Sequence, residues 1–353
     1  METRIAARSY PSVFQAWNPA DNLHEDPAMT LARHDLVFSG AGLFGLQWNT
    51  ANIGLATSFR PRSLSHGRAT RKRMLARNPN QILLMEIRYR DAPANYLPAD
   101  HAWWKRDQAG NVKKGWEKGG YLLLDFANPA FRDQVAKQCA AAIRSGVVDG
   151  VMLDWWQDDD DRLALIQSIR QHIGEQALIL VNANDRTTPR TAPYINGYFM
   201  ECYRSESTDD WQRIANSLSW AEQHLRAPHI NCLETWYHHS RNDFNLMRAT
   251  TTLSLTLSDG YCLFSDPGSL ATPDHLHNWY PFWEKQLGKA LASGCARPDG
   301  SIRREFEKGT VIYNPMGNVP VTISFDSPRT SAATSLRGKT FRVNEGDGDY
   351  YLK

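Results

Sequence analysis

The feature that most constrains the fold of this chain is a series of short, uninterrupted apolar runs, most of them separated by segments with helical periodicity. Runs that are apolar at nearly every position are typical of parallel strands covered on both faces, whereas a half-exposed strand alternates apolar and polar residues. One intervening helix is predicted to begin at Asn128-Pro129, an N-cap followed by a first-turn proline. The eight runs occupy residues 36–39, 82–87, 121–125, 150–154, 178–182, 197–202, 230–234 and 260–264.

Eight strands that mostly alternate with helices over about 250 residues match the size and order of a (β/α)8 barrel. The alternative is an open doubly wound sheet, which ordinarily carries a glycine-rich phosphate turn after its first strand. Gly40, Gly42 and Gly45 have the GxGxxG spacing, but no clear helix follows them, so we interpret them as a tight loop at the top of the barrel. A last helix is predicted from the apolar residues Trp279, Phe282, Trp283, Leu287 and Leu291.

Two further segments stand apart from the alternating pattern. Residues 89–120 form a long connection that carries Trp103, Trp104 and Trp116, and we expect a lid or a substrate-contacting excursion there. Only 15 residues separate the fifth and sixth runs, and Pro189 and Pro193 leave room for at most a short helix. After residue 296 helical periodicity disappears and β-rich runs follow. We therefore predict a barrel domain with an N-terminal extension over 1–297, and a small antiparallel β-sandwich module over 298–353.

Composition excludes several classes of function. Forty Lys and Arg residues against 38 Asp and Glu residues give a net charge of +2, with no dominant basic run, which disfavours a nucleic-acid partner. The longest apolar stretches fall far short of the roughly 20 residues that a membrane-spanning helix needs. No secretion signal is visible, so we expect a cytoplasmic protein, or a periplasmic or secreted one whose signal was removed. Five widely spaced cysteines without a CxxC pair indicate free thiols. The oligomeric state stays open.

Acidic residues terminate or follow most of the runs, and chemistry in such barrels occurs at the carboxyl ends of the strands. A carboxylate in an apolar run must be paired, exposed in a cleft or protonated. When several meet at one rim, their pKa values are forced apart, so that one carboxyl can donate a proton while another stays ionised. These acids are Glu86, Asp125, Asp154, Glu201, Glu234 and Asp266.

Asp154 is the strongest catalytic candidate, because it follows four apolar residues and precedes two indoles. Its alternative role is capping a helix. For Glu201, catalysis and a structural ion pair are both open, and Glu234 is similar. Glu86 and Asp125 have basic neighbours, Arg88 and Arg90 among them, and are expected to form ion pairs that hold the rim together or to orient substrate hydroxyls. The acids 158–161 suit a helix N-terminus.

Two acids at an aromatic barrel mouth are what glycosidic bond cleavage requires: one protonates the leaving oxygen, while the other attacks the anomeric carbon or activates water. Retention and inversion are both open at this point. No cofactor is needed, and the pairs His238/His239 and His275/His277 lack zinc-site spacing. The rival is a catalytically silent carbohydrate-binding barrel; a metal-dependent sugar isomerase or a Schiff-base aldolase is less favoured, because no strand ends in lysine. The aromatic residues expected to contact the oligo- or polysaccharide are Trp48, Trp103, Trp104, Trp155, Trp156, Trp236 and Tyr203.

Residues 122–129 and 149–154 resemble the D-x-x-N-P … DG-hydrophobic-LD arrangement of glycosyl-hydrolase-like family 15, distant kin of the endo-α-1,4-polygalactosaminidases. The likeness spans much of residues 36–325. It implies a TIM-barrel glycoside hydrolase with its nucleophile or base at the end of the fourth strand, which is Asp154. Related clans add an acid at the fifth or sixth strand. The fifth ends in Asn182, so the resemblance assigns the general acid to Glu201, with retention preferred to inversion.

Overall fold

The computed structural model describes residues 1–265 and 275–353. Its core is a barrel of eight parallel strands that are hydrogen-bonded in chain order. The barrel closes where Val13, just before β1, bridges Cys262 of β10 in parallel, with the Cys262 amide donating to the Ser12 carbonyl at 2.9 Å. The strands are β1 (Phe14–Ala16), β2 (Leu36–Ser39), β3 (Ile82–Glu86), β6 (Gly150–Leu153), β7 (Leu178–Asn182), β8 (Gly197–Cys202), β9 (Cys232–Trp236) and β10 (Tyr261–Ser265).

The predicted barrel is confirmed, but one of its strands was assigned wrongly and another was missed. Residues 121–125 do not enter the barrel; β5 (Leu122–Leu123) pairs antiparallel with β4 (Asp91–Ala92) outside it. The first barrel strand is β1, whose three residues are too few to register as an apolar run. Because one strand was added and one was missed, the number of barrel strands before Asp154 is the same as predicted. Asp154 therefore still follows the fourth strand, and Glu201 still lies on the sixth.

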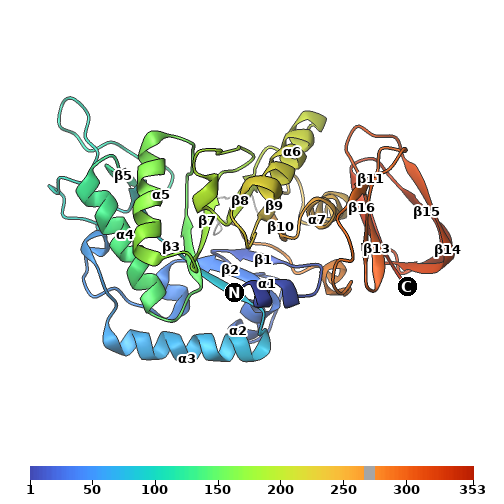
Figure 1. Ribbon diagram of the computed structural model, residues 1–353, viewed down its shortest axis with the longest axis horizontal. Coiled ribbons are helices and arrows are strands. Elements are labelled where there is room, and N and C mark those ends of the chain that lie inside the picture. The colour runs from blue at the N-terminus through green and yellow to red at the C-terminus, as the bar shows by residue number, and fades with distance from the viewer. Residues whose placement is uncertain (266–274) are drawn as a thin grey trace.

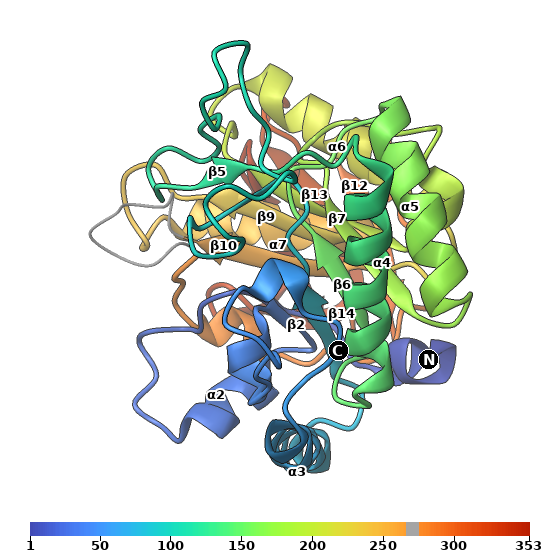
Figure 2. The same cartoon turned by 90° about the vertical axis from the view of Figure 1, so that its left-hand side faces the viewer.

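Helices surround the barrel, as the view in Figure 2 shows. Asn128 caps α4 as predicted, its side-chain oxygen accepting from the Ala130 amide. The helix predicted after the eighth strand is wrong, because the chain forms only one 3₁₀ turn from Pro281 and then bridges Tyr10 at Gly288. The helices are α1 (Glu2–Ala7), α2 (Pro27–Arg33), α3 (Pro61–Arg77), α4 (Pro129–Arg144), α5 (Asp160–Ile173), α6 (Thr208–His224) and α7 (Phe244–Leu257), with 3₁₀ turns η1 (Ala41–Phe44), η2 (Ile53–Leu55), η3 (Ala192–Tyr194) and η4 (Pro281–Glu284).

The three loops that sequence analysis singled out each have regular backbone structure. The GxGxxG segment is a tight turn: η1 ends at Gly45, whose φ of 72° lies in the left-handed region that glycine tolerates. The excursion over 89–120 lies between β3 and α4, and its two arms are pinned together by the β4–β5 pair and by bridges such as Trp104–Leu124. No α-helix lies between β7 and β8, only η3, as the two prolines predicted.

The C-terminal region forms a six-stranded antiparallel sheet of order β11-β12-β13-β16-β14-β15 at one end of the molecule (Figure 1). The sheet folds back on itself at β14. Only the end of this strand, Thr330 and Ser331, pairs with β16, whereas side chains of its first half pack against those of β13 and β16. The division into domains at 297 stays a prediction, and β11 lies just before it. The strands are β11 (Cys295–Ala296), β12 (Ile302–Phe306), β13 (Gly309–Asn314), β14 (Val321–Ser331), β15 (Arg337–Val343) and β16 (Asp347–Leu352).

This sheet packs against α7 of the barrel. Arg248 of α7 forms an ion pair with Asp347 at 2.7 Å, and the rings of Phe282 and Tyr350 lie 4.1 Å apart. Gly348 lies so close to α7 that a Cβ atom there would meet the Thr252 hydroxyl at 1.9 Å. Among the described residues, no helix combines the length and apolarity needed to span a bilayer.

Candidate active site

Every barrel strand delivers a polar or aromatic side chain to the same rim, because the carboxyl ends of parallel strands share one face of the barrel. Four of the residues are acids that sequence analysis had selected, and four are not acids. Asp266, the acid expected after the eighth strand, lies outside the described residues. In strand order the rim residues are Trp17, Ser39, Glu86, Asp154, Asn182, Glu201, Glu234 and Ser265.

The centre of the rim is a bridge between Asp154 and Glu201. The Asn182 amide nitrogen donates to Asp154 Oδ1 at 2.8 Å and to Glu201 Oε2 at 2.7 Å. One NH₂ group has two hydrogens, one for each acceptor. The two accepting oxygens are therefore at most about 5.5 Å apart, which is below the roughly 6.5–9.5 Å carboxyl separation of inverting glycosidases.

The other two oxygens of the pair, Asp154 Oδ2 and Glu201 Oε1, do not bond to Asn182. Asp154 Oδ1 also accepts from the Trp155 amide at 2.9 Å, whereas Oδ2 accepts no hydrogen bond from the described residues. On Glu201, Oε1 lies 3.9 Å from His275 Nε2. The Glu201 side chain is 22% exposed, so the pair is reachable from solvent.

The surroundings push the two carboxyl pKa values apart. Burial raises the pKa of Asp154 to about 6, helped by the negative charge of Glu86 and opposed by the Asn182 hydrogen bond and Arg88. Burial raises the pKa of Glu201 to about 8; His275 opposes this shift, while the charges of Asp154 and Glu234 add to it. At neutral pH Glu201 is therefore protonated and Asp154 ionised, which are the states needed by a proton donor and a nucleophile.

Glu234, expected to contact substrate, has a completely buried side chain that does not reach solvent at the mouth. It lies opposite Glu201 in the register between β8 and β9. Its carboxylate accepts from Ser265 Oγ, from Trp236 Nε1 at 3.3 Å and from His275 Nδ1 at 2.8 Å. Because Nδ1 donates to Glu234, the Nε2 edge of His275 faces Glu201. Glu234 therefore orients His275 beside Glu201.

Glu86 is held at the opposite side of the rim. Trp17 Nε1 donates to its Oε2 at 2.9 Å, and Arg88 pairs with its Oε1 at 3.2 Å, so the predicted pairing with Arg88 is present. The Trp17 ring also lies 5.0 Å from that of His275 and so bridges the two sides of the site. Sequence reasoning missed Trp17 because it missed β1; the only signal was its place two residues before a proline turn.

Trp155 presents an indole beside Asp154. Its φ of 58° is in the left-handed region, which is unfavourable for a bulky residue and persists only where neighbours enforce it. Here the Trp155 carbonyl accepts from Tyr89 at 2.7 Å and from Arg162 at 2.8 Å, and Arg90 lies 4.2 Å from the ring centroid. The indole remains 45% exposed. This arrangement gives an apolar face at the mouth.

The other predicted aromatic contacts divide into two groups. Tyr203 is 41% exposed and lies 5.9 Å from Trp236, so these rings form a second aromatic wall beside β8 and β9. Trp104 and Trp156 are buried in the core with their indole nitrogens bonded to Pro98 and Thr191, so the prediction that they contact sugar is wrong.

Two further candidates, Trp103 in the excursion and Asp125 just after it, make no printed contact with the acid cluster. Trp103 packs on Phe131 of α4 at 5.2 Å. Asp125 is held by its backbone, whose amide donates to the Trp103 carbonyl and whose carbonyl accepts from the Asn128 amide, and its carboxylate makes no hydrogen bond or ion pair with any residue that the structure describes. The predicted pairing of Asp125 with an arginine is therefore absent; Arg90 binds Asp91 instead.

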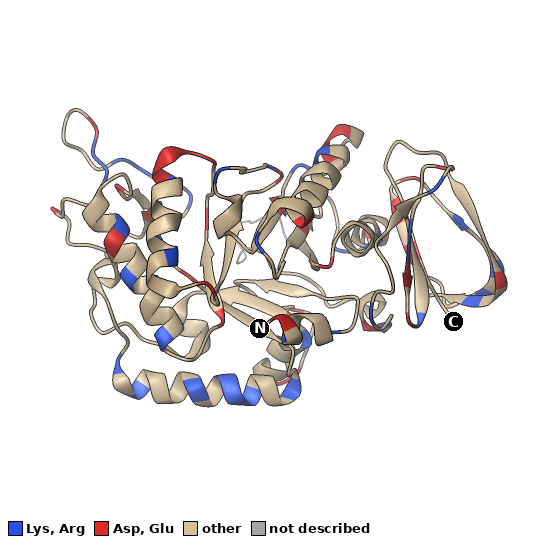
Figure 3. Cartoon of the chain, viewed as in Figure 1, with Lys and Arg blue, Asp and Glu red and all other residues tan. Residues whose placement is uncertain are grey.

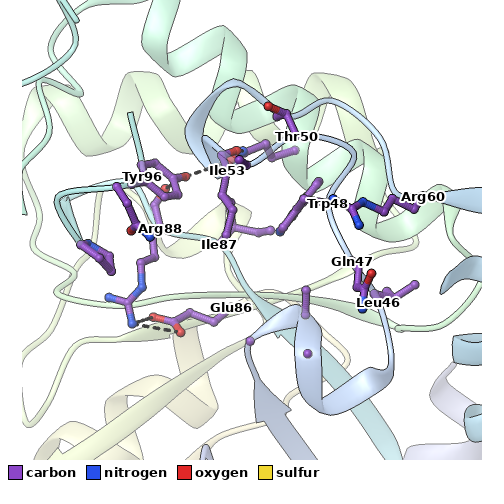
Figure 4. A pocket seen from close by; sticks show the side chains of 17 residues that line it. Leu46, Gln47, Trp48, Thr50, Ile53, Arg60, Glu86, Ile87, Arg88 and Tyr96 are labelled. Atoms are coloured by element: carbon purple, nitrogen blue, oxygen red, sulfur yellow. Dashed lines mark hydrogen bonds and ion pairs between the residues drawn. The ribbon is translucent and has the colours of Figure 1, made fainter. Parts of the chain in front are cut away.

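A cavity of about 590 Å³ adjoins the acids on the side of β2 and β3, and Trp48 lies in its wall (Figure 4). The Trp48 ring is stacked on Phe59 at 4.1 Å. A smaller recess shares Glu86 and Arg88 with this cavity and reaches Asp154 and Trp155. The cavity itself is lined by neither Asp154 nor Glu201, and Glu86 and Arg88 separate it from the recess at Asp154.

No grouping of three His, Cys, Asp or Glu side chains suited to a metal ion occurs within residues 1–265 and 275–353. Two histidines of the pairs that lack zinc-site spacing are hydrogen-bonded to other side chains: His277 Nε2 pairs with His34 Nε2 at 2.9 Å, and His238 Nε2 with Ser205 Oγ at 3.0 Å.

Comparison of structures found similar proteins, whereas comparison of sequences did not. No family model and no curated protein sequence matches the chain. The structure is similar to a noncanonic maltogenic alpha-amylase, AmyB, from Thermotoga neapolitana (TM-score 0.59, 9% identity, 100% of both chains). It is also similar to the cyclic alpha-maltosyl-(1→6)-maltose hydrolase of Arthrobacter globiformis (TM-score 0.54, 12% identity, 100% of both chains). A third similar structure is the alpha-amylase of Geobacillus thermoleovorans complexed with acarbose (TM-score 0.52, 11% identity, 97% and 98% covered). The chain therefore shares its fold, a (β/α)8 barrel followed by an antiparallel sheet, with these glycoside hydrolases.

Proposed function

We propose that this protein is a glycoside hydrolase that cleaves an oligo- or polysaccharide with retention of configuration. The observation that carries the proposal is the Asn182 bridge, which holds a carboxyl with a pKa of about 6 and one of about 8 at the spacing of a double displacement. The shared fold with hydrolases of α-glucosidic substrates supports it.

In the first step, Asp154 Oδ2 attacks the anomeric carbon and forms a glycosyl ester, while Glu201 transfers its proton to the departing glycosidic oxygen. Asn182 keeps its hydrogen bonds to Asp154 Oδ1 and Glu201 Oε2 throughout. In the second step Glu201, now ionised, takes a proton from water, and the resulting hydroxide displaces Asp154 and releases the sugar. Trp155, Trp236 and Tyr203 supply apolar faces for the sugar rings.

The test compares three variants by reducing-end release on a panel of glycans. Asp154→Asn and Glu201→Gln should each lower kcat by at least about 10³-fold without lowering Tm, since the pair acts as a unit. The matched control is Glu206→Gln, an exposed acid on the loop after β8, which should retain full activity. Turnover that survives in Asp154→Asn would overturn the proposal.

A second assay separates the two roles. With an aryl glycoside whose leaving group needs no proton, Glu201→Ala should still form the glycosyl ester, and added azide should restore turnover as the glycosyl azide of retained configuration. Asp154→Ala should stay inactive until azide replaces the nucleophile, and it should then give the opposite anomer. Glycan retention without cleavage by the wild-type enzyme would instead identify a carbohydrate-binding barrel.

A further inference from the structure

The cavity beside the acids carries an unneutralised positive charge. Its charged lining residues are Arg60, Glu86 and Arg88. Glu86 and Arg88 neutralise one another in an ion pair at 3.2 Å. The guanidinium of Arg60 forms no hydrogen bond or ion pair with any described residue, and Figure 4 shows it directed toward Trp48. The cavity therefore offers one unpaired guanidinium next to one indole.

From this arrangement we infer that the substrate is an acidic glycan, whose anionic group binds Arg60 while its sugar ring lies on Trp48. This inference rests on the proposed function and specifies its substrate class. A guanidinium binds a planar carboxylate through two parallel N–H donors, which is stronger and more directional than a hydrogen bond to a hydroxyl. The cavity volume of about 590 Å³ is within the roughly 300–1,000 Å³ of ligand pockets.

A second observation extends the positive charge beyond the cavity. Helix α3 begins directly after Arg60 and contains basic but no acidic residues; Figure 3 shows it with blue bands and no red. Arg62, Arg73 and Arg77 recur at helical spacing on one exposed stripe. Arg62 and Arg73 make no ion pair with the described residues, and Arg77 approaches Asp26 only at 4.0 Å.

The inner basic residues of α3 have a different role. Arg68 donates to the Ser145 carbonyl, and Arg71 to the Val147 carbonyl and Asp149, so these side chains fix the helix to the barrel. The outward stripe has no such structural use. Because it starts at the cavity and runs along one helix, a polymer held at Arg60 can continue along it, which favours a polyanionic chain over a membrane surface.

The test measures binding separately from cleavage, using full-length Glu201→Gln enzyme so that no substrate is consumed. Affinity electrophoresis is run in polygalacturonate and in alginate, each beside the carboxyl-reduced form of the same polymer. We expect retardation by an acidic polymer but not by its reduced form. Adding Arg60→Gln should weaken the affinity by about tenfold or more, whereas Arg337→Gln, an exposed arginine on β15, should leave it unchanged.

The stripe is tested with chain length. The triple change Arg62→Gln, Arg73→Gln and Arg77→Gln should weaken binding of the long acidic polymer and flatten its salt dependence. It should not affect a trisaccharide of the same sugar, which only Arg60→Gln should weaken. Phosphatidylglycerol vesicles that bind through this stripe, in a protein that no acidic polymer retards, would overturn the inference.

The outcomes distinguish this inference from the proposed function. Hydrolysis of a neutral glycan that needs Asp154 and Glu201, without retardation by acidic polymers, would overturn the acidic substrate and keep the hydrolase. Equal binding of native and carboxyl-reduced polymers, or an Arg60→Gln variant that binds like its parent, would also overturn it. Arg60-dependent binding of an acidic polymer with no cleavage by the wild type would keep the acidic site and remove the hydrolase.

Discussion

At the scale of single residues, Asn182 decides how the two carboxyls behave. Its amide satisfies one oxygen on each acid and leaves the other oxygen of each for reaction. Without this donor the pKa values of both carboxyls would rise further, because the Asn182 hydrogen bond favours the ionised form of each.

The change Asn182→Leu conserves approximate volume and removes both donors. We expect kcat to fall by about 100-fold, because the two groups lose their relative orientation, while KM changes little. Kinetics on the best substrate of the panel, with Tm measured on the same samples, check this. A variant with unaltered kcat would show that the bridge has no part in catalysis.

The pH dependence follows from the two shifted pKa values. The ionised form of Asp154 requires a pH above about 6, and the protonated form of Glu201 a pH below about 8. The profile of kcat/KM should therefore be bell-shaped, with its acid limb near 6 and its alkaline limb near 8. Initial rates between pH 4 and 10 measure it. A rate that stays flat from pH 6 to 10 would contradict the role of Glu201.

The same carboxyl costs stability at high pH. Burial raises the pKa of Glu201 from the usual 4.5 to about 8, so the folded state holds a proton that the unfolded state releases. Folding stability from this group is therefore lost as pH rises between these values. Glu201→Gln removes this loss, so its Tm should exceed that of the wild type at pH 9 and match it at pH 4. Thermal unfolding at both pH values checks the sign.

At the scale of elements, the turn after β6 holds Trp155 in the unfavourable left-handed region, and in this conformation its indole is exposed. Tyr89 and Arg162 hold the Trp155 carbonyl, and the indole faces solvent in consequence. The neighbouring Trp156 is in the core. Two adjacent tryptophans thus have separate roles.

This contrast gives a paired prediction. Trp155→Ala should raise KM by up to about tenfold, the value of a stacking contact, with little change in Tm. Trp156→Ala should lower stability by about 3–5 kcal/mol through the cavity it leaves. Steady-state kinetics and chemical denaturation of both variants test the assignment. A KM effect confined to Trp156→Ala would reverse it.

At the scale of the whole molecule, the C-terminal sheet is joined to the barrel by close packing on α7. Arg248 pairs with Asp347 at this contact, and Gly348 lies against Thr252 with no space for a side chain.

Gly348→Ala should therefore destabilise the protein by about 1–3 kcal/mol through overpacking. Gly338→Ala is the matched control, because a Cβ atom at that position of β15 meets only ordinary contacts, the nearest at 3.6 Å. Differential scanning calorimetry should show a lower Tm for the first variant alone. Equal Tm values would mean that the sheet moves away from α7 at no cost.

The sequence by itself determined the kind of barrel. Strands that are apolar throughout need both faces covered, and few folds other than a (β/α)8 barrel provide this when eight strands mostly alternate with amphipathic helices. It also placed Asp154, Glu201, Glu234 and Glu86 at one rim, since strand ends share a face. The sequence could not reveal β1, because three residues are too few to show a periodicity. It led to the wrong placement of 121–125 in the barrel, because an apolar run does not indicate which strand it pairs with.

Tertiary structure alone decided which rim residues act together. Asn182 joins Asp154 to Glu201, Glu234 is buried behind His275, and Trp17 bridges from β1, because these contacts link residues far apart in the chain. Whether an indole is exposed at the mouth or buried in the core likewise depends on the tertiary fold, as the adjacent Trp155 and Trp156 show. Local sequence specifies the elements, whereas distances, burial and pKa values arise only when the closed barrel brings those elements together.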